Sequence, residues 1–263
     1  MKYEVMLGRT FRTVGSVVFG QCHFSTNTAM LMSRGALIVL EGCDRTGKTT
    51  QCRKIVQGLN DSGMKAKMRT FPDRSTPIGC LIDAYLKKEC EMEDHAVHLL
   101  FTANRWELMP GMKKDLEAGV TLVVDRYSFS GVAFSGAKSM LDLEWCFQPE
   151  QGVIRPDVVL YFDVSLHEAA KRGEYGSERY EVRSFQEKVA ANYAWLRTED
   201  WQVIDGSKSV DEVYKNVMSV VKSVISKAKS RPIRYLELPK ECSIKMQTNL
   251  INGNSKHHDS KDD

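Results

Sequence analysis

Short apolar runs alternate with longer amphipathic stretches from Gly35 to about Lys229. Short apolar runs bounded by polar residues are typical of buried strands, whereas apolar residues at every third or fourth position are typical of helices. The runs predict strands over residues 36–40, 65–71, 120–124, 157–162 and 201–205. The amphipathic stretches predict helices near residues 48–62, 94–118, 127–138, 165–172, 183–199 and 209–228.

This alternation predicts an α/β fold, a three-layer sandwich in which helices flank one five-stranded parallel sheet. Three of the predicted strands are almost continuously apolar, as is typical of strands that helices cover on both faces. We find no internal repeat and no linker that would divide the core, residues 35–229. In such folds ligands bind at the carboxyl ends of the strands, where we therefore expect the site.

The composition narrows the class of protein further. Hydrophobic residues make up 42% and charged residues 27% of the 263 residues, which is ordinary for a soluble globular protein. A net charge of +3 is too small to indicate a nucleic-acid or lipid partner, and no apolar run is long enough to cross a bilayer. Seven cysteines without a CxxC pair predict free thiols in a reducing compartment. We expect a soluble intracellular protein that binds neither nucleic acid nor membranes.

The two ends of the chain differ in composition from the core. Residues 1–34 form an extension rich in Ser and Thr, with Glu4 as the sole acid in its first thirty residues. This composition is compatible with a mitochondrial transit peptide, and equally with a floppy extension or a later start at Met30 or Met32. Without targeting we expect a cytoplasmic protein, with the nucleus also open to it. Residues 230–263 lose the apolar period and predict a disordered polar tail.

A phosphate-binding loop follows the first predicted strand. Residues 42–49, GCDRTGKT, fit the pattern GxxxxGKT between an apolar strand and a helix. Glycines let backbone N–H groups surround phosphate oxygens, while Lys48 would reach the β and γ phosphates and Thr49 would bind Mg²⁺. The chain lacks the NKxD motif of a GTPase. We assign the ATP- and phosphate-binding loop to Gly42, Asp44, Arg45, Thr46, Gly47, Lys48, Thr49 and Thr50.

Two charged residues inside this loop need a separate explanation. Asp44 and Arg45 are either a solvated pair of little energetic consequence or part of the chemistry. A guanidinium at Arg45 would lie beside the transferring phosphate and could act as an arginine finger supplied in cis. The Asp44 carboxylate cannot serve a triphosphate directly, so it indicates a second substrate that offers a hydroxyl group.

Two further positions place charge at apolar elements. In the helix that contains HLLFTANRWE, Phe101 and Arg105 share one stripe, which predicts a base pocket or a snorkelling arginine. In the first interpretation Phe101 stacks on the base and Arg105 donates to a base carbonyl. Asp125 ends a buried strand, where it would hold Mg²⁺ or its waters, or else cap the next helix. His95 and His98 are interpreted as ordinary helix histidines.

Five blocks together resemble the thymidylate kinase family, most closely its animal members, over residues 35–225. They are LEGCDRTGKTTQ, TFPDRSTPIG, HLLFTANRWE, VVDRYSFSGVAFSGAK and KRGEYGSERYE. The resemblance implies a phosphate-loop NTPase fold and a homodimer. It also implies a Mg²⁺-dependent kinase that makes dTDP from dTMP and ATP by direct in-line transfer. A kinase for UMP or CMP, a nucleoside kinase and a non-catalytic nucleotide-binding subunit are the alternatives.

The resemblance also implies roles for residues that the pattern alone leaves open. Arg74 and Arg126 would hold the dTMP phosphate, and Asp44 would bind its 3′-hydroxyl. A lid over residues 172–182 would bring Arg172 to ATP and Tyr180 against the 2′ position of the sugar, and it also carries Glu178 and Arg179. The division of labour between Arg45 and Arg179 stays open. Further pocket residues are Phe71, Ser130, Gly131 and Phe134.

Overall fold

The structure, a computed structural model, describes residues 33–172 and 178–237. All of them belong to a single compact unit of the chain. Most of the expected amino-terminal extension (residues 1–32), the middle of the expected lid (173–177) and most of the expected tail (238–263) lie outside the described residues. The expectations for those segments therefore stay predictions.

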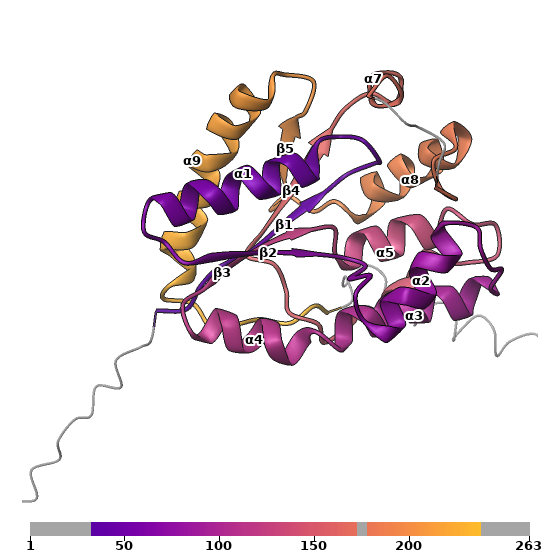
Figure 1. Cartoon of the computed structure of the whole chain (residues 1–263), viewed down its shortest axis with the longest axis horizontal. Coiled ribbons are helices and arrows are strands. Elements are labelled where there is room, and N and C mark those ends of the chain that lie inside the picture. Colours follow the sequence, from indigo (N-terminus) through magenta and orange to yellow (C-terminus); the bar gives the residue numbers. More distant parts are fainter. Residues whose placement is uncertain (1–32, 173–177, 238–263) are drawn as a thin grey trace, which may run out of the picture. The chain divides into compact units, whose positions relative to one another are not determined.

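One parallel sheet of five strands organises the described chain (Figure 1). The strands lie in the order β2-β3-β1-β4-β5, and every pair of neighbours is parallel. This confirms the predicted fold class and the position of all five strands. Their bounds are β1 (Leu37–Glu41), β2 (Ala66–Thr70), β3 (Thr121–Asp125), β4 (Val158–Asp163) and β5 (Gln202–Asp205).

Helices cover both faces of this sheet, which is why β1 and β3 are buried along their whole length. Along β1 the side chains alternate between two cores, as the period of two in a strand requires. Ile38 and Leu40 pack with α1 (Lys48–Asp61) and α9 (Val210–Ala228). Leu37 and Val39 pack on the other face with the core that contains α4 (Met109–Glu117), α5 (Ser128–Ser135) and α8 (Arg183–Leu196).

The remaining helices correct the sequence prediction, which joined two helices into one and missed α2 (Pro77–Leu86), α6 (Leu143–Phe147) and the 3₁₀ turn η1 (Gln148–Glu150). The helix expected over residues 94–118 is two helices, α3 (Asp94–Trp106) and α4, because Pro110 in the first turn of α4 has no N–H to continue α3. Thr76 caps α2 by accepting a hydrogen bond from Gly79 N–H. The fold also contains α7 (Leu166–Ala170).

Three chain segments that leave the sheet side by side form the site. Residue Asp125 at the end of β3 is in register with Leu40 of β1 on one side and with Thr70 of β2 on the other. The phosphate loop therefore lies next to the turn that begins at the cis peptide bond between Phe71 and Pro72. None of the helices in the described part of the chain combines the length and apolarity needed to cross a membrane.

The first residues of the expected tail are packed against the core. Arg34 donates hydrogen bonds to the carbonyl oxygens of Arg231 at 2.6 Å and Pro232 at 3.3 Å. Tyr235 forms a β-bridge with Ile154, and Leu236 is buried. The prediction of a disordered tail from residue 230 therefore starts too early. Residues 231–237 are ordered, because they bury an apolar side chain and pair backbone groups with the core.

Candidate functional site

The phosphate loop between β1 and α1 encloses the Lys48 ammonium group. Lys48 Nζ donates to the carbonyl oxygen of Cys43 at 2.5 Å and to Thr46 Oγ1 at 3.1 Å. Gly42 has a φ of 140°, and a Cβ there would lie 2.7 Å from the Phe162 carbonyl oxygen, so the sharp turn requires glycine. Burial lowers the pKa of Lys48 to about 8, and an anion bound in the loop would raise this pKa again.

A cavity of about 400 Å³ opens over this loop. We call it the donor cavity. Its wall contains most of the residues predicted to bind nucleotide phosphates, while Gly42 shapes the loop from outside the wall. The lining residues are Arg45, Thr46, Gly47, Lys48, Thr49, Thr50, Asp125, Arg126 and Arg172.

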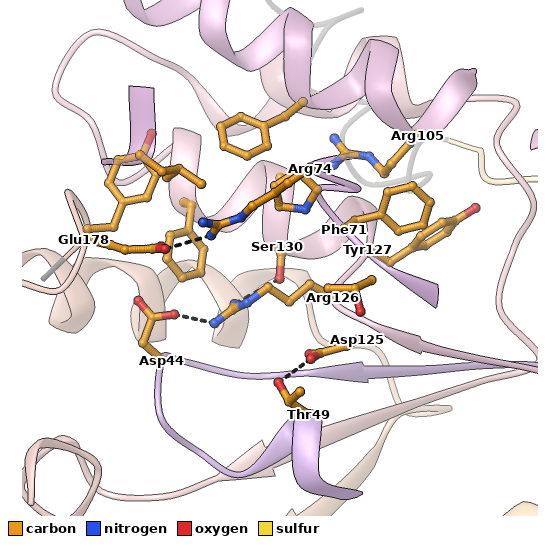
Figure 2. A pocket seen from close by; sticks show the side chains of 17 residues that line it. Asp44, Thr49, Phe71, Arg74, Arg105, Asp125, Arg126, Tyr127, Ser130 and Glu178 are labelled. Carbon is orange, nitrogen blue, oxygen red and sulfur yellow. Dashed lines mark hydrogen bonds and ion pairs between the residues drawn. The ribbon is translucent and has the colours of Figure 1, made fainter. Parts of the chain in front are cut away.

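The donor cavity contains a pair of oxygens that suits a divalent cation. Thr49 Oγ1 donates a short hydrogen bond to Asp125 Oδ2 (Figure 2). Asp125 Oδ1 is buried and has no hydrogen-bond partner among the described residues. A buried carboxylate oxygen without a partner is costly unless a cation or its water satisfies it. Thr49 and Asp125 therefore fit Mg²⁺, and no group of three or more metal-binding side chains occurs elsewhere in the described ranges.

Two arginines line the donor cavity from different parts of the chain, Arg45 from the phosphate loop and Arg172 from the segment after α7. The backbone of Arg45 is left-handed, with a φ of 63°, which is uncommon for a residue other than glycine. Its Nε donates a hydrogen bond to Glu181 Oε1 at 2.9 Å. Arg172 follows α7, and its Nη2 donates to the Gly206 carbonyl oxygen at 2.7 Å. Glu181 lies in the expected lid, so this carboxylate now binds the guanidinium that was predicted to serve the transferring phosphate.

A second cavity of about 240 Å³ lies beyond the end of β2. We call it the acceptor cavity (Figure 2). Every residue predicted to bind the acceptor nucleotide lines it. These residues are Asp44, Phe71, Arg74, Phe101, Arg105, Arg126, Ser130, Gly131, Phe134 and Tyr180. The lid residue Glu178 joins them, and Glu178 Oε1 lies 2.8 Å from Arg74 Nη2 in an ion pair.

Asp44 and Arg126 form an ion pair where the two cavities meet. Arg126 Nη2 donates to Asp44 Oδ1, and the Arg126 guanidinium carbon lies 5.0 Å from the centroid of the Phe134 ring. Arg126 has a φ of 66°, so its backbone turns sharply directly after β3 and directs the side chain toward the phosphate loop. Asp44 lines the acceptor cavity but not the donor cavity. This favours its assignment to the acceptor nucleotide over the donor phosphates.

Gln186 holds Asp44 in place, and sequence reasoning missed it. Its Nε2 donates to Asp44 Oδ2 at 2.6 Å and to the Tyr180 carbonyl oxygen at 2.9 Å, while its Oε1 accepts from Asp44 N–H at 3.0 Å. One buried side chain on α8 thus connects the phosphate loop to the lid. No local pattern could have found it, because Gln186 is 142 residues from Asp44.

Glu41 is a second residue that sequence reasoning missed. Its buried carboxylate accepts hydrogen bonds from Tyr127 N–H at 2.9 Å, Ser130 Oγ at 2.5 Å and Tyr193 Oη at 2.8 Å. The carboxylate therefore fixes the start of α5 beneath Arg126. A signal was present in the sequence, since Glu41 is the acid that directly ends an apolar strand.

The tyrosine of the lid has an aromatic setting. The Tyr180 ring stacks on Phe185, with centroids 5.0 Å apart and planes inclined by 8°. Phe134 lies on another side, with centroids 5.7 Å apart. These contacts keep the Tyr180 ring in the wall of the acceptor cavity.

Arg179, the other candidate for the arginine finger, lies in neither cavity. Its guanidinium carbon lies 4.1 Å from the centroid of the Tyr85 ring. Its Nη2 donates to Glu91 Oε1 at 2.8 Å, and its Nε donates to the Tyr85 carbonyl oxygen at 2.9 Å. Arg179 thus fastens the lid to the end of α2, which favours Arg45 as the finger.

Known proteins resemble this chain in sequence and in structure. The sequence model of the family described as thymidylate kinase matches residues 40–217. The thymidylate kinases of Danio rerio and Homo sapiens are 50% and 49% identical to the chain over 210 residues, 79% of this chain and 99% of theirs. The solved structure of thymidylate kinase from Candida albicans superposes with a TM-score of 0.71 at 33% identity, covering 78% of this chain and 99% of that one.

Proposed function

Because the chain belongs to the thymidylate kinase family, we propose that its two cavities hold the donor and the acceptor of one phosphoryl transfer. The activity is that of a dTMP kinase, which phosphorylates dTMP with ATP as the donor in the synthesis of dTTP.

On the donor side, the phosphate loop binds the β and γ phosphates of ATP through its N–H groups and Lys48. Thr49 and Asp125 would hold Mg²⁺, which would supply positive charge to neutralise the ATP phosphates. Arg45 exchanges Glu181 for the phosphoryl group in transit, and Arg172 contacts the nucleotide from α7.

On the acceptor side, Phe101 stacks on thymine and Arg105 donates to a base carbonyl. Arg74 and Arg126 bind the dTMP phosphate, Asp44 accepts from the 3′-hydroxyl, and the Tyr180 ring excludes a 2′-hydroxyl. The wall is completed by Phe71, Ser130, Gly131 and Phe134.

One observation carries this division of labour. Thr49, Asp125 and Arg126 line both cavities, so the two nucleotides meet phosphate to phosphate at these three residues. An oxygen of the dTMP phosphate then attacks the γ-phosphorus in line, and ADP leaves on the opposite side. Arg126 lies between two anions that repel each other, which lowers the barrier to their approach. No group that could act as a covalent carrier is needed.

Turnover of a panel of monophosphates tests the proposal. The purified full-length chain, ATP and Mg²⁺ are combined with dTMP, dUMP, dCMP, UMP and CMP, and with thymidine as the non-phosphorylated control. We expect kcat/KM to be highest for dTMP. Faster turnover of CMP, UMP or thymidine would contradict the assignment of the acceptor cavity.

We further propose that the chain forms a homodimer through α2 and α3. These helices pack together and expose large apolar side chains, Leu81 on α2 and Leu99 and Trp106 on α3. Leu99 and Trp106 are seven positions apart and so share a helix face, which suits a second copy. Sedimentation of Leu99→Asp beside the wild-type chain tests this, since the variant should be monomeric.

From the sequence we propose a cytoplasmic and also nuclear location for the protein, or a mitochondrial one if residues 1–34 act as a transit peptide.

A further inference from the structure

The wall of the acceptor cavity contains an ion pair that is sealed on one side only. Arg105 on α3 is 2% exposed, and Glu150 in η1 is fully buried. Arg105 Nε donates to Glu150 Oε2 at 2.8 Å, and Arg105 Nη2 donates a second, short hydrogen bond to Glu150 Oε1. Thr102 Oγ1 also donates to Glu150 Oε1, at 2.6 Å, which fixes the carboxylate in turn.

This pairing leaves one nitrogen of the guanidinium unused. Among the described residues Arg105 Nη1 has no hydrogen-bond partner. It is also absent from the buried polar atoms that lack a partner, so it retains contact with open space. Arg105 lines the acceptor cavity, so Nη1 is the donor that reaches it. Gly131 packs directly against the same guanidinium, since a Cβ there would lie 3.2 Å from Nη1 and 2.4 Å from Nη2. The orientation of the group is therefore fixed by Glu150 behind it and Gly131 beside it.

A fixed guanidinium of this kind can recognise one class of base. Arginine donates hydrogen bonds and cannot accept them. Uracil and thymine present a carbonyl oxygen at position 4, an acceptor, whereas cytosine presents an amino group there, a donor. A guanidinium that was free to rotate could withdraw from an amino group and bind elsewhere. One that is held by two hydrogen bonds cannot, so the mismatch leaves buried donors unpaired.

We propose that Glu150 is a positioning residue that holds Arg105 as a reader of the base carbonyl, so that Glu150 sets discrimination between 4-oxo and 4-amino pyrimidine monophosphates. The inference rests on the proposed function of the acceptor cavity and adds a residue to it. The stability of the fold does not account for the pair, because a buried ion pair is seldom more stabilising than apolar residues of the same volume.

The experiment compares two variants with a matched control. Glu150→Gln removes the negative charge at constant shape, and Glu150→Asp keeps the charge but is too short to hold both nitrogens. The control is Asp157→Asn. Asp157 forms the same kind of two-point pair with Arg34, at 2.7 and 2.8 Å, with both side chains at most 10% exposed. That pair lies at the amino ends of β1 and β4, whereas the site lies at the carboxyl ends of the strands.

The readouts are kcat/KM for dTMP, dUMP and dCMP, KM for ATP, and Tm. For Glu150→Gln we expect the dUMP/dCMP ratio of kcat/KM to fall about tenfold or more, as the loss of a charged hydrogen bond implies. The dTMP/dUMP ratio and KM for ATP should stay within about twofold, because neither depends on position 4. Glu150→Asp keeps a negative charge beside Arg105 and should fold. We expect its dUMP/dCMP ratio to lie between those of the wild-type chain and Glu150→Gln. Asp157→Asn should lower Tm and leave every ratio unchanged.

Two results would overturn the inference. One is an unchanged dUMP/dCMP ratio in both Glu150 variants, whatever their Tm. The other is an equal loss of discrimination in Asp157→Asn, which would make the effect a general consequence of lower stability. The wild-type chain separates this failure from that of the proposed function, because a wild type that prefers dCMP to dTMP would contradict the function before Glu150 is altered.

Discussion

Replacing Gly131 by alanine should damage acceptor binding through a single added carbon. The new Cβ would lie 2.4 Å from Arg105 Nη2 and 3.0 Å from its Cζ, well inside van der Waals contact. Arg105 cannot move aside without leaving Glu150, to which it donates two hydrogen bonds. The added methyl group therefore either displaces the base-reading guanidinium or strains α5.

The size of the effect follows from two opposing contributions. Overpacking a buried site costs about 1–3 kcal/mol, and alanine in place of glycine within a helix returns about 0.5–1 kcal/mol. The middle of each range leaves a net loss of about 1 kcal/mol, which corresponds to a fall in Tm of roughly 2–5 °C for a domain of this size. Displacement of Arg105 should also raise KM for dTMP about tenfold, the equivalent of about 1.4 kcal/mol. KM for ATP should not change.

Gly111→Ala is the matched control, because Gly111 is also in a helix but a Cβ there would meet nothing within 4 Å. We expect this variant to gain Tm and to keep all kinetic constants. Differential scanning calorimetry and steady-state kinetics of both variants provide the test. If Gly131→Ala matches Gly111→Ala in Tm and in KM for dTMP, the close packing of Gly131 against Arg105 is refuted.

Two further predictions concern the finger and the stability of the fold. Arg45→Ala should lower kcat by about a thousandfold, the effect of removing an arginine finger, whereas Arg179→Ala should lower it far less because Arg179 stacks on Tyr85. Single-turnover assays measure this, and the reverse order of effects would make Arg179 the finger. Burial lowers the pKa of His98 to about 4, so its contribution to stability is complete above the ordinary value of 6.5 and is lost as the pH falls from 6.5 toward 4. Urea unfolding should therefore show a loss of about 2 kcal/mol from this residue between pH 7.5 and pH 5, absent in His98→Gln and retained in the control His95→Gln, whose side chain is exposed. A pH dependence that survives in His98→Gln would contradict this origin.

The phosphate loop and the ends of the strands could be predicted because their signals are local. Gly42 and Gly47 are needed for left-handed backbone within the loop itself, and Lys48 follows directly. Asp125 and Arg126 terminate a continuous apolar run, which fixes their place at the sheet edge. The five strands were found for the same reason.

The supporting residues could not be predicted because their partners are distant in sequence. Glu150 is 45 residues from Arg105, and nothing near it distinguishes it from a surface acid. Gln186 appears as an ordinary polar residue of an amphipathic helix until α8 brings it to Asp44. The helix α2 (Pro77–Leu86) was missed, although Thr76 as its N-cap and Pro77 in its first turn are local signals of a helix start.

The lid carboxylates have a consequence for how nucleotides bind. Glu178 holds Arg74 and Glu181 holds Arg45, so each of these guanidinium groups already has an anionic ligand that belongs to the protein itself. An incoming phosphate is therefore a competitor, and its apparent affinity is the difference between two anion-binding equilibria rather than the strength of one. Mutation of either glutamate to glutamine should then tighten nucleotide binding, because it removes an anion that competes with the phosphate for the guanidinium group.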